Sequence, residues 1–285
     1  MKDDNEIKEM VREKYASIAT QTKDVNQASC CGATSPCGGD DVYNIMSDDY
    51  TKLPGYNPGA DLGLGCGLPT EFAKINEGDT VIDLGSGAGN DCFIARKITG
   101  EKGKVIGIDF TEPMIKLATK NAEQLSYNNV EFRQGDIEQM PVSSETADVV
   151  VSNCVLNLVP NKEAVFQEIF RVLKPRGHFS MSDIVLTGDL PDKWKDIAEL
   201  YAGCVSGAIQ KETYLGMIEK AGFKNIILQK EKPIIIPDNI LENYLSREEI
   251  QAFKNSGANI ISITVFAEKP GVETENCCLP GSGCC

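Results

Sequence analysis

The feature that most constrains the fold is a regular alternation of short apolar runs and helical segments between residues 80 and 186. The first run, TVIDL at 80–84, ends at a glycine, which is typical of a buried strand. Further strands are expected at 104–109, 129–136, 147–153 and 178–186, with helices at 89–98, 111–125 and 161–173, the last two capped by Thr111 and Asn161. This alternation predicts an α/β fold with a doubly wound, mostly parallel, Rossmann-like sheet.

The segments on either side of this core are less regular. Apolar residues recur at helical spacing over 4–20, which predicts an amphipathic helix, and a long Gly-rich and Cys-rich loop follows it. Beyond the core we expect helices at 194–204, 211–223 and 239–253 and strands at 225–231 and 259–269. The expected parts are an N-terminal helix and Cys-rich loop (1–74), the doubly wound unit (75–187), a smaller C-terminal α+β region (188–271) and a disordered Cys-rich tail (272–285).

Charge and cysteine content narrow the classes of partner. The chain has 28 Lys and Arg against 42 Asp and Glu, a net charge of −14, which argues against nucleic acid and anionic membranes as partners. No apolar run is long enough to span a bilayer, and the charged first residues do not resemble a signal peptide, so a cytoplasmic location is expected. Thiols stay reduced there, so 11 cysteines indicate metal, metalloid or redox chemistry rather than structural disulfides.

A glycine-rich turn marks the first candidate site. Gly85, Gly87 and Gly89 follow the first strand and precede a helix, where glycine allows a sharp turn and close approach of a ligand. Asp83 lies two residues before the first glycine, and Asp109 ends the next strand at the position of a ribose-binding carboxylate. The G-x-G-x-G spacing favours a ligand without phosphates and with a cationic amino-acid end. A tight turn without a ligand is the alternative.

The motifs D-L-G-S-G-A-G (83–89), G-I-D (107–109) and G-D-I (135–137) resemble those of class I S-adenosylmethionine-dependent methyltransferases over about residues 75–185. The resemblance implies that the glycine loop and the first-strand acid hold the methionine part of the cofactor. It also implies that the second-strand acid holds the ribose and that the third-strand acid takes the adenine amino group. Met114 is expected to pack on the adenine, with a core methionine as the alternative. The implied cofactor residues are Asp83, Gly85, Ser86, Gly87, Gly89, Asp109, Met114, Asp136, Ile137 and Asn153.

Three cysteines lie in contexts that suit a soft ligand. Cys66 lies in a glycine-rich loop, Cys154 directly follows the fourth strand, and Cys204 has small neighbours. They form no C-x-x-C pair, which argues against a zinc ribbon or a thioredoxin-type site. Three thiolates without a fourth ligand suit As(III), whose lone pair needs no general base. The single histidine, His178, is accordingly expected to be structural, and Cys92 is expected in the core.

The segments L-G-C-G-L-P (64–69), S-N-C-V-L-N-L-V-P (152–160) and A-G-C-V-S-G-A (202–208) resemble the three cysteine motifs of arsenite methyltransferases. In that family the matched cysteines bind As(III), which implies a substrate site at Cys66, Cys154 and Cys204. Some members use an upstream cysteine in the redox step. Cys30, Cys31 and Cys37 are the candidates, and the sequence does not choose among them.

The expected function is methylation of arsenite or thiol-bound As(III) with S-adenosylmethionine, giving methylarsenicals and S-adenosylhomocysteine and serving arsenic detoxification. A thiol reductant such as glutathione or thioredoxin is the expected co-substrate, and the chain is expected to be a monomer. Two alternatives remain: methylation of a carbon atom of a quinone or sterol, and a non-catalytic metalloid-binding protein that uses the terminal cysteine pairs. The number of methyl groups added is left open.

Overall fold

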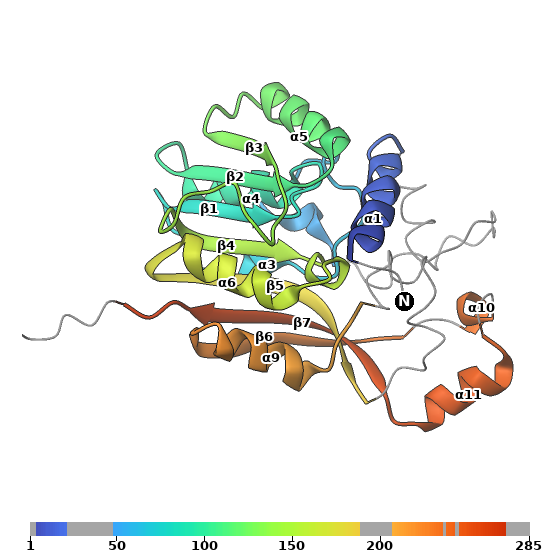
Figure 1. Ribbon diagram of the computed structural model, residues 1–285. Coiled ribbons are helices and arrows are strands. Elements are labelled where there is room, and N and C mark those ends of the chain that lie inside the picture. The colour runs from blue at the N-terminus through green and yellow to red at the C-terminus, as the bar shows by residue number, and fades with distance from the viewer. Residues whose placement is uncertain (1–3, 22–47, 189–206, 236–237, 243–244, 272–285) are drawn as a thin grey trace, which may run out of the picture.

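A seven-stranded sheet runs through the molecule in the order β3-β2-β1-β4-β5-β7-β6 (Figure 1). The computed structural model describes residues 4–21, 48–188, 207–235, 238–242 and 245–271. β1 to β5 pair in parallel, and β7 pairs antiparallel with both β5 and β6. The predicted doubly wound, mostly parallel sheet is confirmed. The strands are β1 (Thr80–Leu84), β2 (Lys104–Asp109), β3 (Val130–Gln134), β4 (Ala147–Asn153), β5 (Leu173–Thr187), β6 (Lys224–Ile234) and β7 (Asn259–Glu268).

The helices follow most of the expected ranges. The predicted cap of α6 is confirmed, because the Asn161 side chain accepts from Ala164 N at 3.1 Å. Thr111 lies at the N-cap of α5, but its hydroxyl bonds Asp109 instead of capping the helix. The helical elements are α1 (Asp4–Ile18), η1 (Tyr50–Lys52), α3 (Pro69–Phe72), α4 (Asn90–Thr99), α5 (Glu112–Gln124), η2 (Leu156–Leu158), α6 (Lys162–Val172), α9 (Lys211–Lys220), α10 (Asp238–Leu241) and α11 (Arg247–Asn255).

The single helix expected over 239–253 is wrong, because two helices, α10 and α11, occupy this stretch. Ser246 starts the second one: its hydroxyl accepts from Glu249 N, and the Glu249 carboxylate accepts from Ser246 N. This reciprocal capping box stabilises a new helix start. The helix expected over 194–204 lies outside the described residues.

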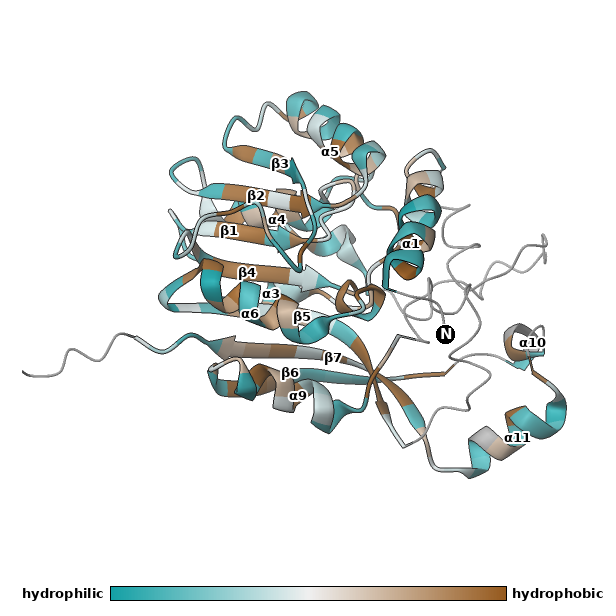
Figure 2. Cartoon of the chain, in the orientation of Figure 1, coloured by the Kyte–Doolittle hydropathy of each residue, from teal (hydrophilic) through white to brown (hydrophobic). Residues whose placement is uncertain are grey.

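Both faces of the central strands are covered by helices. Val81 packs in one apolar layer with Phe93 of α4, whereas its neighbour Ile82 packs in a second layer with Phe166 of α6. Successive strand residues point to opposite faces, so a strand buried on both sides becomes apolar throughout. Figure 2 shows this as hydrophobic colour along β1 and β4.

The strand order also locates the candidate site. The chain crosses from β1 to β2 on one side of β1, and β4 pairs with the other side of β1. Ligands of open α/β sheets bind at the carboxyl ends of the strands where the order switches in this way. β6 and β7, which follow residue 187, extend the same sheet, and the expected domain boundaries stay predictions. Among the described residues, no helix is both long and apolar enough to span a membrane.

Candidate active site

A cavity lies at the carboxyl ends of β1, β2 and β4, and α1 and residues 60–65 line its other sides. It encloses about 1130 Å³ of empty space, part of which is open to solvent. Gly89 does not line it, and its role as a cofactor residue stays a prediction. The structure brings together the other residues expected to hold the cofactor: Asp83, Gly85, Ser86, Gly87, Asp109, Met114, Asp136, Ile137 and Asn153.

Glycine is needed at the three positions of the turn after β1 for different structural reasons. All have positive φ: 63° at Gly85, 51° at Gly87 and 96° at Gly89. A Cβ at Gly85 would lie 2.4 Å from Cγ2 of Val155, so the turn packs directly on the loop after β4. A Cβ at Gly89 would lie 2.9 Å from the Phe93 ring, which assigns this glycine to packing behind the cavity wall.

The buried carboxyl groups of Asp83, Asp91 and Asp109 line the cavity. Asp83, Asp91 and Asp109 are 2%, 9% and 8% exposed. Burial raises the pKa of Asp83 well above its ordinary value, and the negative charges of Asp91 and Asp109 raise it further. Burial raises the pKa of Asp91 to about 6 and also raises that of Asp109. Within the described part of the chain no basic side chain pairs with any of them, so a cationic ligand would relieve their repulsion.

The remaining contacts of this wall hold the acids in place. Asp109 accepts from Gly87 N at 3.0 Å and from Thr111 N at 2.9 Å, and the Cys92 thiol donates to Asp83 across 3.2 Å. Cys92 is fully buried, as expected for a core residue.

Two buried polar atoms on the cavity wall are available to a ligand. Ser86 Oγ and Asn90 Oδ1 have no hydrogen-bond partner among the described residues. Buried polar groups are normally bonded, so these two atoms fit a polar ligand in the cavity.

Helix α1 closes the side of the cavity that carries Asp136. Lys8 donates to Asp136 Oδ2 at 2.7 Å and also contacts Glu138. Burial lowers the pKa of Lys8, but its hydrogen bonds with the two acids and the attraction of their charges together raise it above its ordinary value. Met114 and Ile137 are both buried nearby. The carboxylate expected to meet the adenine amino group is thus shared with a lysine from α1.

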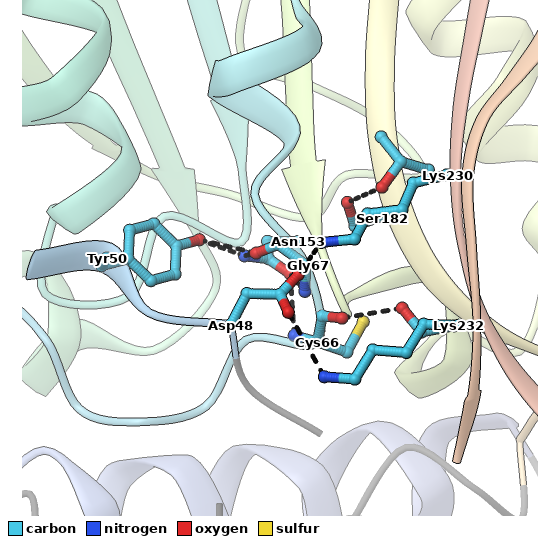
Figure 3. Close-up of polar contacts among 10 residues, drawn as sticks. Asp48, Tyr50, Cys66, Gly67, Asn153, Ser182, Lys230 and Lys232 are labelled. Carbon is cyan, nitrogen blue, oxygen red and sulfur yellow. Dashed lines mark hydrogen bonds and ion pairs between the residues drawn. The ribbon is translucent and has the colours of Figure 1, made fainter. Parts of the chain in front are cut away.

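The segment that carries Cys66 is bonded to β4 (Figure 3). Asn153 Oδ1 accepts from Cys66 N at 3.0 Å and from Gly67 N at 3.3 Å, and Asn153 Nδ2 donates to Gly67 O at 2.8 Å. Ser262 of β7 donates to Cys66 O at 2.7 Å. The backbone around Cys66 is therefore fixed from two strands.

Cys154 directly follows Asn153 and lines the cavity. Its backbone has a φ of 61°, and its N–H donates to Ser182 O at 2.7 Å. A positive φ is uncommon outside glycine and occurs at functional sites, where the surrounding structure holds it. Cys154 and Cys66 are 3% and 1% exposed and belong to one apolar cluster with Leu158 and Ile184.

The other candidate cysteines cannot be placed. Cys204, Cys30, Cys31 and Cys37 lie outside the described residues. In the part of the chain that is described, no group of three or more His, Cys, Asp or Glu side chains could hold a metal ion. The predicted set of three thiolates stays a prediction.

Three residues at or beside the site, Asp48, Tyr50 and Asp91, were not expected from the sequence. Tyr50 donates to Asp91 Oδ2 at 2.8 Å, and its hydroxyl lies 3.1 Å from Gly67 O. Just before it, Asp48 pairs with Lys230 of β6 at 2.7 Å (Figure 3). Asp91 lies two residues after Gly89, the last glycine of the turn, and this closeness is a signal that could have been used. Tyr50 has no such local signal.

His178 has a structural environment. Its Nε2 lies 2.6 Å from Ala73 O, and its ring packs on Phe266 with the ring centroids 5.0 Å apart. It does not line the cavity. The expectation of a structural histidine agrees with this placement.

Comparisons with known proteins agree with the cavity chemistry. The methyltransferase-domain family model matches residues 75–222. An arsenite methyltransferase of Halobacterium salinarum is 38% identical over 278 residues, which cover 94% of this chain and 68% of that protein. An arsenite methyltransferase of Aquipseudomonas alcaligenes is 30% identical, covering 83% of this chain and 68% of that protein. The solved structure of an arsenic(III) S-adenosylmethionine methyltransferase from Chlamydomonas reinhardtii matches with a TM-score of 0.62 and 33% identity, covering 72% of this chain and 68% of that chain.

Proposed function

The chain belongs to the S-adenosylmethionine-dependent arsenite methyltransferases, and from this premise we propose that it holds trivalent arsenic on the thiolates of Cys66, Cys154 and Cys204. The main support for the proposal is the hydrogen bond from Cys66 N to Asn153 Oδ1. It joins the segment of one candidate ligand to Asn153, which directly precedes a second candidate ligand, Cys154, at the cavity wall. Soft thiolates suit a soft metalloid, and a buried apolar setting keeps water away from it.

The cavity residues fit the cofactor. S-adenosylmethionine supplies, when bound, an electrophilic methyl group on a sulfonium. Asp83 and the glycine turn would hold its cationic amino-acid end, because no basic side chain among the described residues pairs with the buried Asp83 carboxyl group. Asp109 would bind the ribose hydroxyls with charge-assisted hydrogen bonds, and Asp136 the adenine amino group. The work of these residues is to fix the methyl group near the arsenic.

The proposed transfer needs no base from the protein. The arsenic lone pair forms the bond to the methyl carbon, the carbon–sulfur bond breaks, and its electron pair stays on sulfur, which leaves S-adenosylhomocysteine. Arsenic is oxidised from the trivalent to the pentavalent state. Two thiols then supply two electrons and form a disulfide, which returns arsenic to the trivalent state. Glutathione, a thioredoxin, or one of Cys30, Cys31 and Cys37 with a second thiol would supply them.

The biological role that we propose is arsenic detoxification by a cytoplasmic enzyme whose partner is a small arsenic compound. A quinone or sterol carbon as the methyl acceptor is the alternative enzyme. It gives no reason for Cys66 and Cys154 to share one buried cluster. A metalloid buffer would need no buried acids beside a glycine turn.

The test is to replace each of the three cysteines with serine and to measure both As(III) binding and methylarsenical formation. Each single variant should lose most of its methylation activity. Cys92→Ser is the matched control for As(III) binding, because Cys92 is buried but faces Asp83. Full activity of Cys154→Ser would refute the proposed ligand set, and arsenite-independent consumption of S-adenosylmethionine would favour the quinone or sterol reading.

A further inference from the structure

We propose that Tyr50 is a positioning residue that couples occupancy of the cofactor cavity to the placement of the Cys66 segment (residues 65–67). The inference rests on the proposed binding of As(III) by Cys66. Its basis is a set of hydrogen bonds that begins at the cavity acid Asp91 and ends at the backbone of the segment. Figure 3 shows the part of this set that runs from Tyr50 through Asn153 to Cys66 and Gly67.

The Tyr50 hydroxyl lies at the centre of these bonds. Tyr50 is 6% exposed, and its hydroxyl is 2.8 Å from Asp91 Oδ2 and 3.1 Å from Gly67 O. It has one proton, which goes to the carboxyl oxygen, the nearer of the two acceptors. The Asn153 amide donates to the same hydroxyl oxygen. Tyr50 therefore bonds to an acid of the cavity and to the side chain that holds Cys66.

Asn153 carries this connection to the segment. Its amide bonds Cys66 N, Gly67 N and Gly67 O, so its orientation sets the position of the Cys66 backbone. The segment is packed closely enough to follow it, because a Cβ at Gly65 would lie 2.5 Å from Asn153 Nδ2. A shift of the Asn153 side chain would therefore move the backbone of Cys66.

Asp91 forms the cavity end of the connection. It lines the cavity with Asp83, and Thr70 donates to its other oxygen at 3.2 Å. A cation held beside these two carboxyl groups fixes the Asp91 side chain in one orientation. The Tyr50 bond passes that constraint to Asn153, beside a longer direct contact of 3.4 Å from Asn153 Nδ2 to Asp91 Oδ2, so the cofactor orders the Cys66 segment before arsenic binds. Binding linkage is reciprocal, so As(III) must tighten cofactor binding by the same factor.

The experiment measures the As(III) affinity of the full chain by equilibrium dialysis at a fixed glutathione concentration. It is done with and without saturating S-adenosylhomocysteine, which occupies the cavity without reacting. In the wild-type chain the affinity should rise at least about fivefold with S-adenosylhomocysteine, the lower end of usual coupling factors. In Tyr50→Phe, which removes one oxygen atom and keeps the ring, the ratio should fall toward one, because only the longer Asn153–Asp91 contact is left.

Two variants control for general loosening. Tyr56→Phe removes a hydroxyl that donates to Asp61, another cavity acid, at 3.0 Å and leaves the Asp91–Tyr50–Asn153 bonds in place, so it should keep the wild-type ratio. Ser262→Ala removes the bond to Cys66 O and should weaken As(III) binding equally with and without S-adenosylhomocysteine. Should Tyr50→Phe fail to fold, Asp91→Asn tests the same connection and should also lower the ratio.

The outcomes separate this inference from the proposed function. A wild-type ratio of one, or a wild-type ratio retained in Tyr50→Phe, overturns the coupling role of Tyr50. An As(III) affinity that Cys66→Ser leaves unchanged would instead overturn the proposed ligand set, whatever the ratio. Loss of the ratio in Tyr50→Phe with retention in Tyr56→Phe supports the inference.

Discussion

The backbone N–H of Cys66 donates to Oδ1 of Asn153 across 3.0 Å, although the two residues are 87 positions apart in the sequence. Asn153 ends β4 and precedes Cys154, so a single amide side chain joins the loops of two candidate arsenic ligands. Partners that hold a ligand are often as important as the ligand itself. The first prediction therefore concerns Asn153, which would orient two proposed arsenic ligands without binding arsenic itself.

Asn153→Ala should weaken As(III) binding by about 10–100-fold, the usual effect of removing a partner that orients a ligand. The cause is the loss of three bonds to residues 66 and 67. Equilibrium dialysis of arsenite measures it. Asn129→Ala is the matched control: its amide donates to the carbonyls of Gly100 and Gly103 and does not line the cavity. Equal losses of affinity in the two variants would contradict the positioning role of Asn153.

Gly85→Ala should lower both the affinity for S-adenosylhomocysteine and the thermal stability of the folded chain. Its Cβ would overlap Cγ2 of Val155 at 2.4 Å, and its φ of 63° is strained for alanine. Gly87→Ala is less harmful, since nothing lies within 4 Å of that Cβ. The double variant Gly85→Ala/Val155→Ala should recover part of the loss, as titration calorimetry and thermal unfolding can measure. If it recovers nothing, the overlap is not the cause.

The central sheet could be predicted because its strands are buried on both faces. Val81 and Ile82 belong to different apolar layers, which makes the whole run apolar and sets it apart from its helical neighbours. Asp83 and Asp109 could be placed at the carboxyl edge of the sheet because each lies at or next to the last residue of a predicted strand. The break between α10 and α11 was missed, although S-R-E-E at 246–249 has the capping-box pattern.

Tyr50 could not be found from the sequence. Its partner Asp91 is 41 residues away, and its contact with residue 67 depends on how the loop after it folds back over β4. Local patterns report helices, strands and turns, whereas a bond between distant loops requires the tertiary fold. The bond between Lys8 of α1 and Asp136 could not be predicted for the same reason, since the two residues are 128 positions apart in the sequence.

Asp109→Ala should weaken S-adenosylhomocysteine binding by about 10–100-fold, as expected for the loss of hydrogen bonds to a charged group. Asp109 also holds Gly87 N at 3.0 Å, so the glycine turn loses one anchor. As(III) binding without cofactor should persist, because Asp109 contacts neither Cys66 nor Cys154 by a hydrogen bond in the described residues. Titration calorimetry with each ligand separates the two effects, and an unchanged cofactor affinity would refute the ribose role.

Asp183 should make stability fall as pH rises from about 4 to 7. It is fully buried beneath the loop after Cys154, and Tyr214 donates to it at 2.9 Å. Burial raises its pKa to about 7, although the Tyr214 hydrogen bond and the charge of Lys162 lower it. Since the folded state binds this proton more tightly than the unfolded state, its stabilising effect is full below about pH 4. That effect is lost as pH rises through about 7.

The measurement is the free energy of urea unfolding between pH 4 and 8 for the wild-type chain and Asp183→Asn. The free energy of unfolding of the wild-type chain, relative to that of Asp183→Asn, should fall between about pH 4 and 7 by at most about 1.4 kcal/mol per pH unit. Above about pH 7 the difference should stay constant. Glu131→Gln is the control, because the Arg133 and Lys104 partners lower the pKa of Glu131 to about 2. Its stabilising effect is lost only as pH falls below about 4.5, so its difference from wild type should stay flat between pH 5 and 8. A flat difference for Asp183→Asn as well would show that this carboxyl group titrates alike in both states.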